Sequence, residues 1–214
     1  MIEYIASKQK PLLMATGASN IDEVIMAMNA ALKYTQDIVL MQCNTNYTAS
    51  SENFKYINLN VLKEYKARYP DVILGLSDHT PGHATVLGAV AFGARVIEKH
   101  FTDDMMREGP DHKFSMDFNS WKEMVDTTRE LEVALGSKSK KIEDNEKETV
   151  VLQRRAIRAK NDLQVGVSIT RDMIEVLRPC PKNALPPYRI DEILGKTLIN
   201  HIVSGECVTW EDLK

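Results

Sequence analysis

The chain has 214 residues, of which 43% are hydrophobic and 27% are charged, and its formal net charge at pH 7 is -3. This balance is ordinary for a globular protein with one medium domain or two small ones. The sequence has no basic stripe for a nucleic acid, and no apolar run reaches the roughly 18 residues of a membrane span. Its three cysteines are widely spaced, which argues against a disulfide framework, so we expect a cytoplasmic protein.

The first 136 residues alternate short apolar runs with helical patterns. The runs that predict buried strands are 12–16, 38–42, 72–76 and 95–99. Apolar stripes with helical spacing follow over 21–32, 58–68, 83–92 and 118–135. Asn20 and Glu23 have the spacing of a capping box before the first of these helices. Four consecutive βα units predict a parallel sheet flanked by helices, either an open doubly wound sheet or part of a (β/α)₈ barrel.

The composition changes at Gly136. Residues 137–149 are polar and charged without a period, and we expect a linker there between a domain of residues 1–136 and a domain of residues 150–214. The second domain contains a repeat, in which Gly166–Ile174 matches Gly205–Leu213 as Gly-x-x-(Ile/Val)-Thr-x-(Asp/Glu)-x-(Ile/Leu). Each copy predicts a turn glycine, a short strand and a threonine that caps a brief helical turn; chance similarity is the alternative.

Candidate functional residues follow the strands, because parallel α/β folds bind ligands at the carboxyl ends of their strands. The first strand ends in Ala15-Thr16-Gly17-Ala18-Ser19, which suits a phosphate or carboxylate cradle, or simply a tight turn. The second ends in Gln42-Cys43-Asn44-Thr45-Asn46-Tyr47-Thr48. These polar side chains suit a polyhydroxylated ligand, or a loop that caps the next helix.

A histidine follows each of the next two strands, in Ser77-Asp78-His79-Thr80 and in Glu98-Lys99-His100-Phe101-Thr102. Neighbouring strands lie about 5 Å apart, so both imidazoles can reach one ion. Two imidazoles would bind a divalent transition metal and leave positions for water and substrate oxygens. Histidines with purely structural hydrogen bonds are the alternative. The turn Gly109-Pro110 presents Asp111 at the same end of the sheet.

These motifs, with Gly109-Pro110-Asp111-His112-Lys113, resemble the signature of the sialic acid synthases. That family includes N-acetylneuraminate synthases and bacterial relatives that make legionaminic, pseudaminic and spore-coat sugars. The last 65 residues resemble the antifreeze-like (SAF, β-clip) domain that ends those enzymes. The resemblance implies an α/β fold, the second half of a TIM (β/α)₈ barrel followed by a small, mostly β SAF domain.

The resemblance also implies a transferase that condenses phosphoenolpyruvate with an N-acylated amino sugar and releases phosphate. It implies a divalent ion on His79 and His100, with manganese expected and magnesium or cobalt as alternatives. It further implies a homodimer with exchanged SAF domains, in which Arg178 serves the partner subunit's site. The expected catalytic residues are Asp111 and Glu98. The expected substrate-binding residues are Thr16, Thr45, Tyr47, Ser77, Asp111 and Arg178.

Three positions depart from the usual family pattern. Ala15 replaces a serine, Thr45 an asparagine and Thr48 a proline, so the amino sugar need not be N-acetylmannosamine. Family members also begin with four further βα units that have no counterpart here, so we expect a truncated or split enzyme. The alternatives are a catalytically incomplete remnant that binds a sugar or a subunit, and a different metal-dependent barrel.

Overall fold

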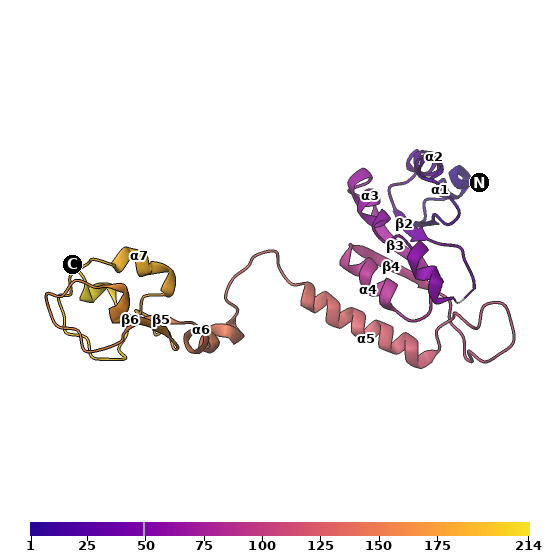
Figure 1. Cartoon of the computed structure of the whole chain (residues 1–214). Helices are drawn as coiled ribbons and strands as arrows, with labels where there is room; N and C mark the ends of the chain where they lie inside the picture. Colours follow the sequence, from indigo (N-terminus) through magenta and orange to yellow (C-terminus); the bar gives the residue numbers. More distant parts are fainter. Residues whose placement is uncertain (49) are drawn as a thin grey trace. The chain divides into compact units, whose positions relative to one another are not determined.

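The computed structural model describes residues 1–48 and 50–214, and the chain divides into two compact units, Met1–Ser137 and Lys138–Lys214 (Figure 1). Each unit has a hydrophobic core of its own. Among the described residues, no helix is both long enough and apolar enough to cross a membrane.

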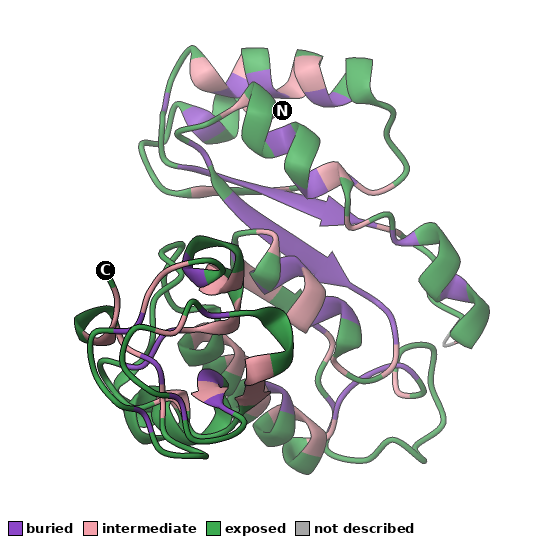
Figure 2. Cartoon of the chain, turned by 60° about the vertical axis from the view of Figure 1, so that its left-hand side comes forward, coloured by how far each residue is buried: buried purple, intermediate pink, exposed green. Residues whose placement is uncertain are grey.

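Unit 1 contains a four-stranded parallel sheet in the order β1-β2-β3-β4. The strands are β1 Leu12–Ala15, β2 Ile38–Cys43, β3 Ile73–Asp78 and β4 Ala94–Lys99. All four expected strands are confirmed, with ends that move by one or two residues. Figure 2 shows the central strands as buried, in line with their apolar, β-branched sequences.

The helices of unit 1 precede, connect and follow these strands. They are α1 Ile2–Ala6, α2 Ile21–Leu32, the 3₁₀ helix η1 Ser51–Tyr56, α3 Val61–Arg68, α4 Ala84–Ala91 and α5 Phe118–Leu135. The expected capping box starts α2, because Glu23 N donates to Asn20 Oδ1 at 3.0 Å and Asn20 N donates to Glu23 Oε2 at 2.8 Å. Helix α3 begins later than expected, since Asn58 has a left-handed φ of 51°. The sequence did not predict α1 or η1.

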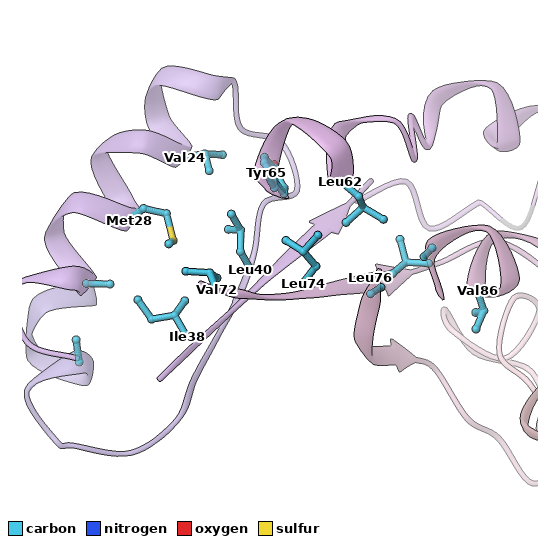
Figure 3. Packing of buried hydrophobic residues seen from close by; sticks show 14 of the residues in the cluster. Val24, Met28, Ile38, Leu40, Leu62, Tyr65, Val72, Leu74, Leu76 and Val86 are labelled. Carbon is cyan, nitrogen blue, oxygen red and sulfur yellow. The ribbon is translucent and has the colours of Figure 1, made fainter. Parts of the chain in front are cut away.

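The two faces of the sheet differ. Side chains of β2 and β3 on one face pack against α2, α3 and α4, as Figure 3 shows for Leu40, Leu74 and Leu76. Each such fully buried side chain contributes about 1.5–3 kcal/mol of transfer free energy. Strand alternation and register put Leu13, Val39 and Ile73 on the other face. Leu13 and Ile73 remain 51% and 49% exposed there, so that face is only partly covered.

Unit 2 is small and held together mainly by isolated bridges and turns. Its antiparallel pair is β5 Ala156–Ala159 with β6 Ile174–Leu177. Its helical segments are η2 Asp144–Glu146, α6 Lys147–Gln153, η3 Arg171–Met173, η4 Pro187–Arg189, α7 Ile190–Ile193 and η5 Trp210–Asp212. A core of aliphatic side chains includes Ile157, Ile169, Ile193, Leu198 and Val208.

The expected linker, residues 137–149, is only partly irregular. Regular structure resumes at η2, where Glu143 and Glu146 form a capping box, and continues into α6. Cys180 N donates to Val151 O at 2.9 Å, which ties α6 to the rest of unit 2. Part of the expected linker therefore has regular structure. The sequence did not predict α6 because its start is charged and has no apolar period, and because its contact with Cys180 lies farther along the chain.

The two copies of the repeat have the same local structure. Gly166 and Gly205 have left-handed φ values of 86° and 85°, which glycine adopts without steric cost. Three residues later, Ile169 and Val208 are 1% and 0% exposed in the core. The threonine of each copy precedes a 3₁₀ turn, η3 or η5, although only the second threonine completes a capping box. The repeat is therefore structural and not a chance similarity.

Limited trypsin digestion is expected to cut first after Lys138, Lys140 or Lys141. These residues are exposed and lie in the irregular stretch between α5 and η2. Mass spectrometry of early time points should show two fragments close to the two units. A variant with all three lysines replaced by glutamine should resist this first cut. First cuts inside β1–β4 or β5–β6 would contradict the division into two units.

Candidate functional site

Three polar side chains line up across neighbouring strands at their carboxyl ends. Cys43 of β2 is paired in register with Ser77 of β3, and Ser77 with Glu98 of β4. Ser77 is buried, and its Oγ donates to Glu98 Oε1 at 2.8 Å. Burial raises the pKa of the Cys43 thiol, and a hydrogen bond with Ser77 opposes that shift. This row orients the Glu98 carboxylate at the end of the sheet.

The two expected histidines meet at these strand ends. His79 and His100 directly follow β3 and β4, and their ring centroids lie 5.2 Å apart. Their expected closeness is confirmed. His79 Nδ1 lies 2.9 Å from Asn44 O, and because a carbonyl can only accept, Nδ1 carries the proton and Nε2 keeps its lone pair. His100 Nδ1 lies 3.6 Å from Asp111 Oδ2. The Nε2 atom of His79 is thus left for a ligand.

Two further aromatic rings surround the imidazoles. The Tyr47 ring lies 4.3 Å from His79 and 5.9 Å from His100. The Phe114 ring lies 4.9 Å from His100, 6.0 Å from His79 and 5.7 Å from Tyr47. Phe114 is 2% exposed, whereas Tyr47 is 48% exposed. Sequence reasoning missed Phe114, because its contacts with the imidazoles depend on how its loop folds back on β4.

The residues present fit a divalent transition metal ion. Imidazole is a good ligand for such ions, and contacts to Nδ1 are the usual means of orienting a metal-binding histidine. Among the described residues, no group of three or more His, Cys, Asp or Glu is arranged to hold a metal. An ion held by His79 and His100 would have further positions for oxygens of water or substrate. That His79 and His100 bind manganese stays a prediction.

A buried ion pair supports both histidines from the other side of the sheet. Lys99 Nζ lies 2.7 Å from Asp78 Oδ2, and the two side chains are 1% and 0% exposed. Lys99 also donates to Thr80 O at 2.7 Å, while Asp78 accepts from the hydroxyls of Thr80 and Thr85. Asp78 precedes His79 and Lys99 precedes His100. Sequence reasoning gave this pair no role, although two charges inside apolar strands were visible.

The remaining expected residues differ in their surroundings. Thr16 Oγ1 donates to Met41 O and accepts from Tyr65 Oη, each at 3.0 Å, so its hydroxyl is already engaged. Burial raises the pKa of Tyr65, and its bond to Thr16 opposes that shift. Thr45 is exposed beside Gly17, and Arg178 is exposed in unit 2. Thr16, Thr45 and Tyr47 line a cavity of ≈ 980 Å³ with residues of the α2 start, η1 and α3.

Gly17→Ala is expected to destabilise unit 1 by about 1–3 kcal/mol, the usual cost of overpacking. A Cβ at Gly17 would lie 2.2 Å from Thr45 Cγ2 and 3.0 Å from Cys43 Sγ. Thr45 adjoins Asn44, whose carbonyl holds His79, so the His79 side-chain NMR signals should shift as well. Adding Thr45→Ser removes Cγ2 and should recover most of the loss in urea unfolding. Equal stability of Gly17→Ala and the unaltered chain would contradict the close contact.

A parallel α/β sheet with its polar residues at the strand ends, followed by a small β unit, is the fold that the comparisons with known proteins also give. Residues 1–140 match the NeuB family, and residues 154–214 match the SAF domain. The chain therefore belongs to the NeuB family.

Several relatives of known name are similar over most or all of the chain. The N,N'-diacetyllegionaminic acid synthase of Legionella pneumophila is 35% identical over 218 residues, which cover 100% of this chain and 60% of the relative. The pseudaminic acid synthase of Campylobacter jejuni is 31% identical and covered to the same extents. The crystal structure of the N-acetylneuraminic acid synthetase of Leptospira borgpetersenii has a TM-score of 0.62 and 26% identity, over 70% of this chain and 51% of that one. The chain thus spans about 60% of the length of these curated relatives.

Proposed function

We propose that this chain forms part of a synthase that joins phosphoenolpyruvate to the aldehyde carbon of an N-acylated amino sugar. The observation that carries the proposal is the pair of imidazoles 5.2 Å apart at adjacent strand ends, with the Nδ1 of His79 engaged by a backbone carbonyl. Membership of the NeuB family supports it, since relatives are named as legionaminic and pseudaminic acid synthases. The particular amino sugar stays open, because Thr45 and Thr48 depart from the usual family pattern.

We further propose that the sheet of unit 1 is the second half of a (β/α)₈ barrel, completed by four more βα units. Support comes from the face that carries Leu13 and Ile73, which stay about half exposed although the strands are apolar. In a closed barrel this face would point inward and be filled by side chains of the other strands.

In the proposed reaction, C3 of phosphoenolpyruvate forms a bond to the aldehyde carbon of the open-chain sugar. Water adds at C2, and phosphate leaves with cleavage of its bond to C2. Of the two protons of the attacking water, one ends on the aldehyde oxygen and the other on the departing phosphate, and C2 becomes a ketone. When bound, a divalent ion would polarise the aldehyde carbonyl as a Lewis acid.

The residues of this chain have distinct parts in that scheme. His79 and His100 present Nε2 atoms that would hold the ion, and Tyr47 packs on His79 where it can contact the sugar. Asp111, 3.6 Å from His100 Nδ1, would contact the sugar and exchange a proton with the aldehyde oxygen. Glu98, oriented by Ser77, would take a proton from the attacking water.

The direct test is phosphate release from phosphoenolpyruvate in the presence of Mn²⁺ and N-acetylmannosamine or another N-acylated amino sugar. The chain should be assayed alone and after co-expression with the first four βα units of a relative. We expect sugar-dependent release only from the combined protein, and its loss on His79→Ala. If the combination is folded and binds Mn²⁺ but never releases phosphate, the second candidate is favoured. That candidate is a sugar-binding or subunit-binding remnant, which the half-exposed sheet face also fits.

Arg178 is proposed to contact the sugar's N-acyl group in the site of a partner subunit. Its planar fork of donors can hold a carbonyl in a fixed orientation, and its side chain is exposed in unit 2. In the combined protein, Arg178→Ala should weaken sugar binding and leave phosphoenolpyruvate binding nearly unchanged. A mixture of Arg178→Ala with His79→Ala should regain part of the activity, because one intact barrel can pair with one intact Arg178. No recovery despite proven subunit exchange would exclude a shared site.

A further inference from the structure

We propose that Phe114 is a positioning residue that holds the His100 imidazole in the orientation needed to bind a divalent ion together with His79. The inference rests on the proposed metal site, and it assigns to Phe114 a part that none of the motifs indicated. Three observations carry it: the path of the loop that bears Phe114, the ring geometry, and a difference between the two histidines in how firmly hydrogen bonds hold them.

The loop after β4 returns to the strand end and brings Phe114 with it. Met116 N donates to His100 O, and Thr102 N donates to Met116 O, each at 2.9 Å. Within the loop, Ser115 Oγ donates to Asp111 O at 2.7 Å. These bonds fix the backbone on both sides of Phe114, whose ring is 2% exposed. Phe114 is thus anchored to the same strand end that carries His100.

The two imidazoles differ in their hydrogen bonds. His79 Nδ1 has a carbonyl at 2.9 Å, which is an ordinary hydrogen-bond length. His100 Nδ1 has its carboxylate at 3.6 Å, which is too long for a firm hydrogen bond, and the Asp111 side chain is 52% exposed. A single-bond rotation could therefore turn the His100 ring more easily than the His79 ring. Something other than hydrogen bonding must hold His100.

Phe114 supplies that restraint. Its ring is nearer to His100, at 4.9 Å, than to His79, at 6.0 Å, and it meets both in edge-on geometry. The Tyr47 ring is 5.9 Å from that of His100 and half exposed, so it restrains rotation of the His100 ring less than Phe114 does. Two imidazoles can share an ion only if both Nε2 lone pairs converge, and Phe114 sets that convergence on the His100 side.

The first test needs no metal. Nuclear Overhauser contacts of the imidazole ring protons should show a single fixed ring orientation for both His79 and His100 in the unaltered chain. In Phe114→Leu the His100 signals should show averaging between states, while His79 keeps its pattern. Phe101→Leu is the matched control, because Phe101 also follows β4 but packs on Trp121 at 5.9 Å. It should leave both histidines unchanged.

The second test is Mn²⁺ affinity by calorimetry, which should fall roughly 10- to 100-fold in Phe114→Leu, as for other residues that orient metal ligands. Phe114→Tyr keeps the ring and should stay close to the unaltered chain. If Phe114→Leu does not fold, the same two measurements are made on Phe114→Met and compared with those of the unaltered chain. Averaged His100 signals in the unaltered chain, or unchanged His100 signals and affinity in the variants, overturn the proposal. Failure of the unaltered chain to bind Mn²⁺ overturns the metal site itself. The metal-free spectra would still test whether Phe114 holds the His100 ring in one orientation.

Discussion

Replacing Lys99 with methionine is expected to lower the free energy of unfolding of unit 1 by about 3–5 kcal/mol, the usual effect of removing one partner of a buried ion pair. Asp78, whose side chain is 0% exposed, would keep its hydroxyl partners but lose the ammonium group of Lys99. A buried carboxylate without a counter-charge must either stay ionised at a high desolvation cost or bind a proton. Methionine nearly matches the length of lysine, so packing changes contribute little.

The measurement can be confined to unit 1, because each unit holds one of the two tryptophans. In a Trp210→Phe background, Trp121 fluorescence alone reports urea unfolding of unit 1. Adding Asp78→Leu to Lys99→Met should restore much of the lost stability, since the double change removes both charges. Lys33→Met, which breaks the exposed pair with Glu3, is the control and should change little. A Lys99→Met loss as small as that control would show that the pair is not a structural support.

Replacing either His79 or His100 with alanine is expected to abolish measurable Mn²⁺ binding, a loss of at least ~100-fold. Among the described residues no third His, Cys, Asp or Glu completes a ligand group with them, so one imidazole alone would have to hold the ion. Calorimetry on the unaltered chain, the two variants and a control would measure the effect.

His83→Ala is the control for that experiment. His83 lies in the same β3–α4 connection, and its side chain does not cap α4. Its replacement should leave Mn²⁺ affinity unchanged and so separate ligation from general changes in the loop. Undiminished Mn²⁺ binding in His79→Ala or His100→Ala would remove the metal site from the proposed function.

Local sequence was sufficient to predict an element where its apolar residues were periodic or where a capping motif marked its start. The bounds of α2 agree with the sequence because an apolar stripe and a capping box both mark its start. The meeting of His79 and His100 followed from strand order alone, since adjacent parallel strands end side by side.

The parts that could not be predicted depend on contacts between distant segments. Phe114 reaches the imidazoles because a loop folds back on its own strand, and nothing in the loop's polar sequence encodes that return. The engagement of Thr16 by Tyr65 joins residues 49 positions apart. The short helix α6 likewise depends on a distant contact, because Cys180, far along the chain, donates to its Val151.

The alternation of side chains at the ends of β3 and β4 limits how the lengths of these segments can vary during evolution. Ser77 and His79 face one way and Asp78 the other, and Glu98, His100 and Lys99 repeat the pattern. Deleting a single residue inside either strand would exchange the two sides, turning a charge toward the ligand and an imidazole into the apolar layer. Such a deletion would remove binding and stability together. Length differences among descendants of this gene should therefore accumulate in connections such as residues 103–110, whose side chains are all exposed, and be absent from the strand ends.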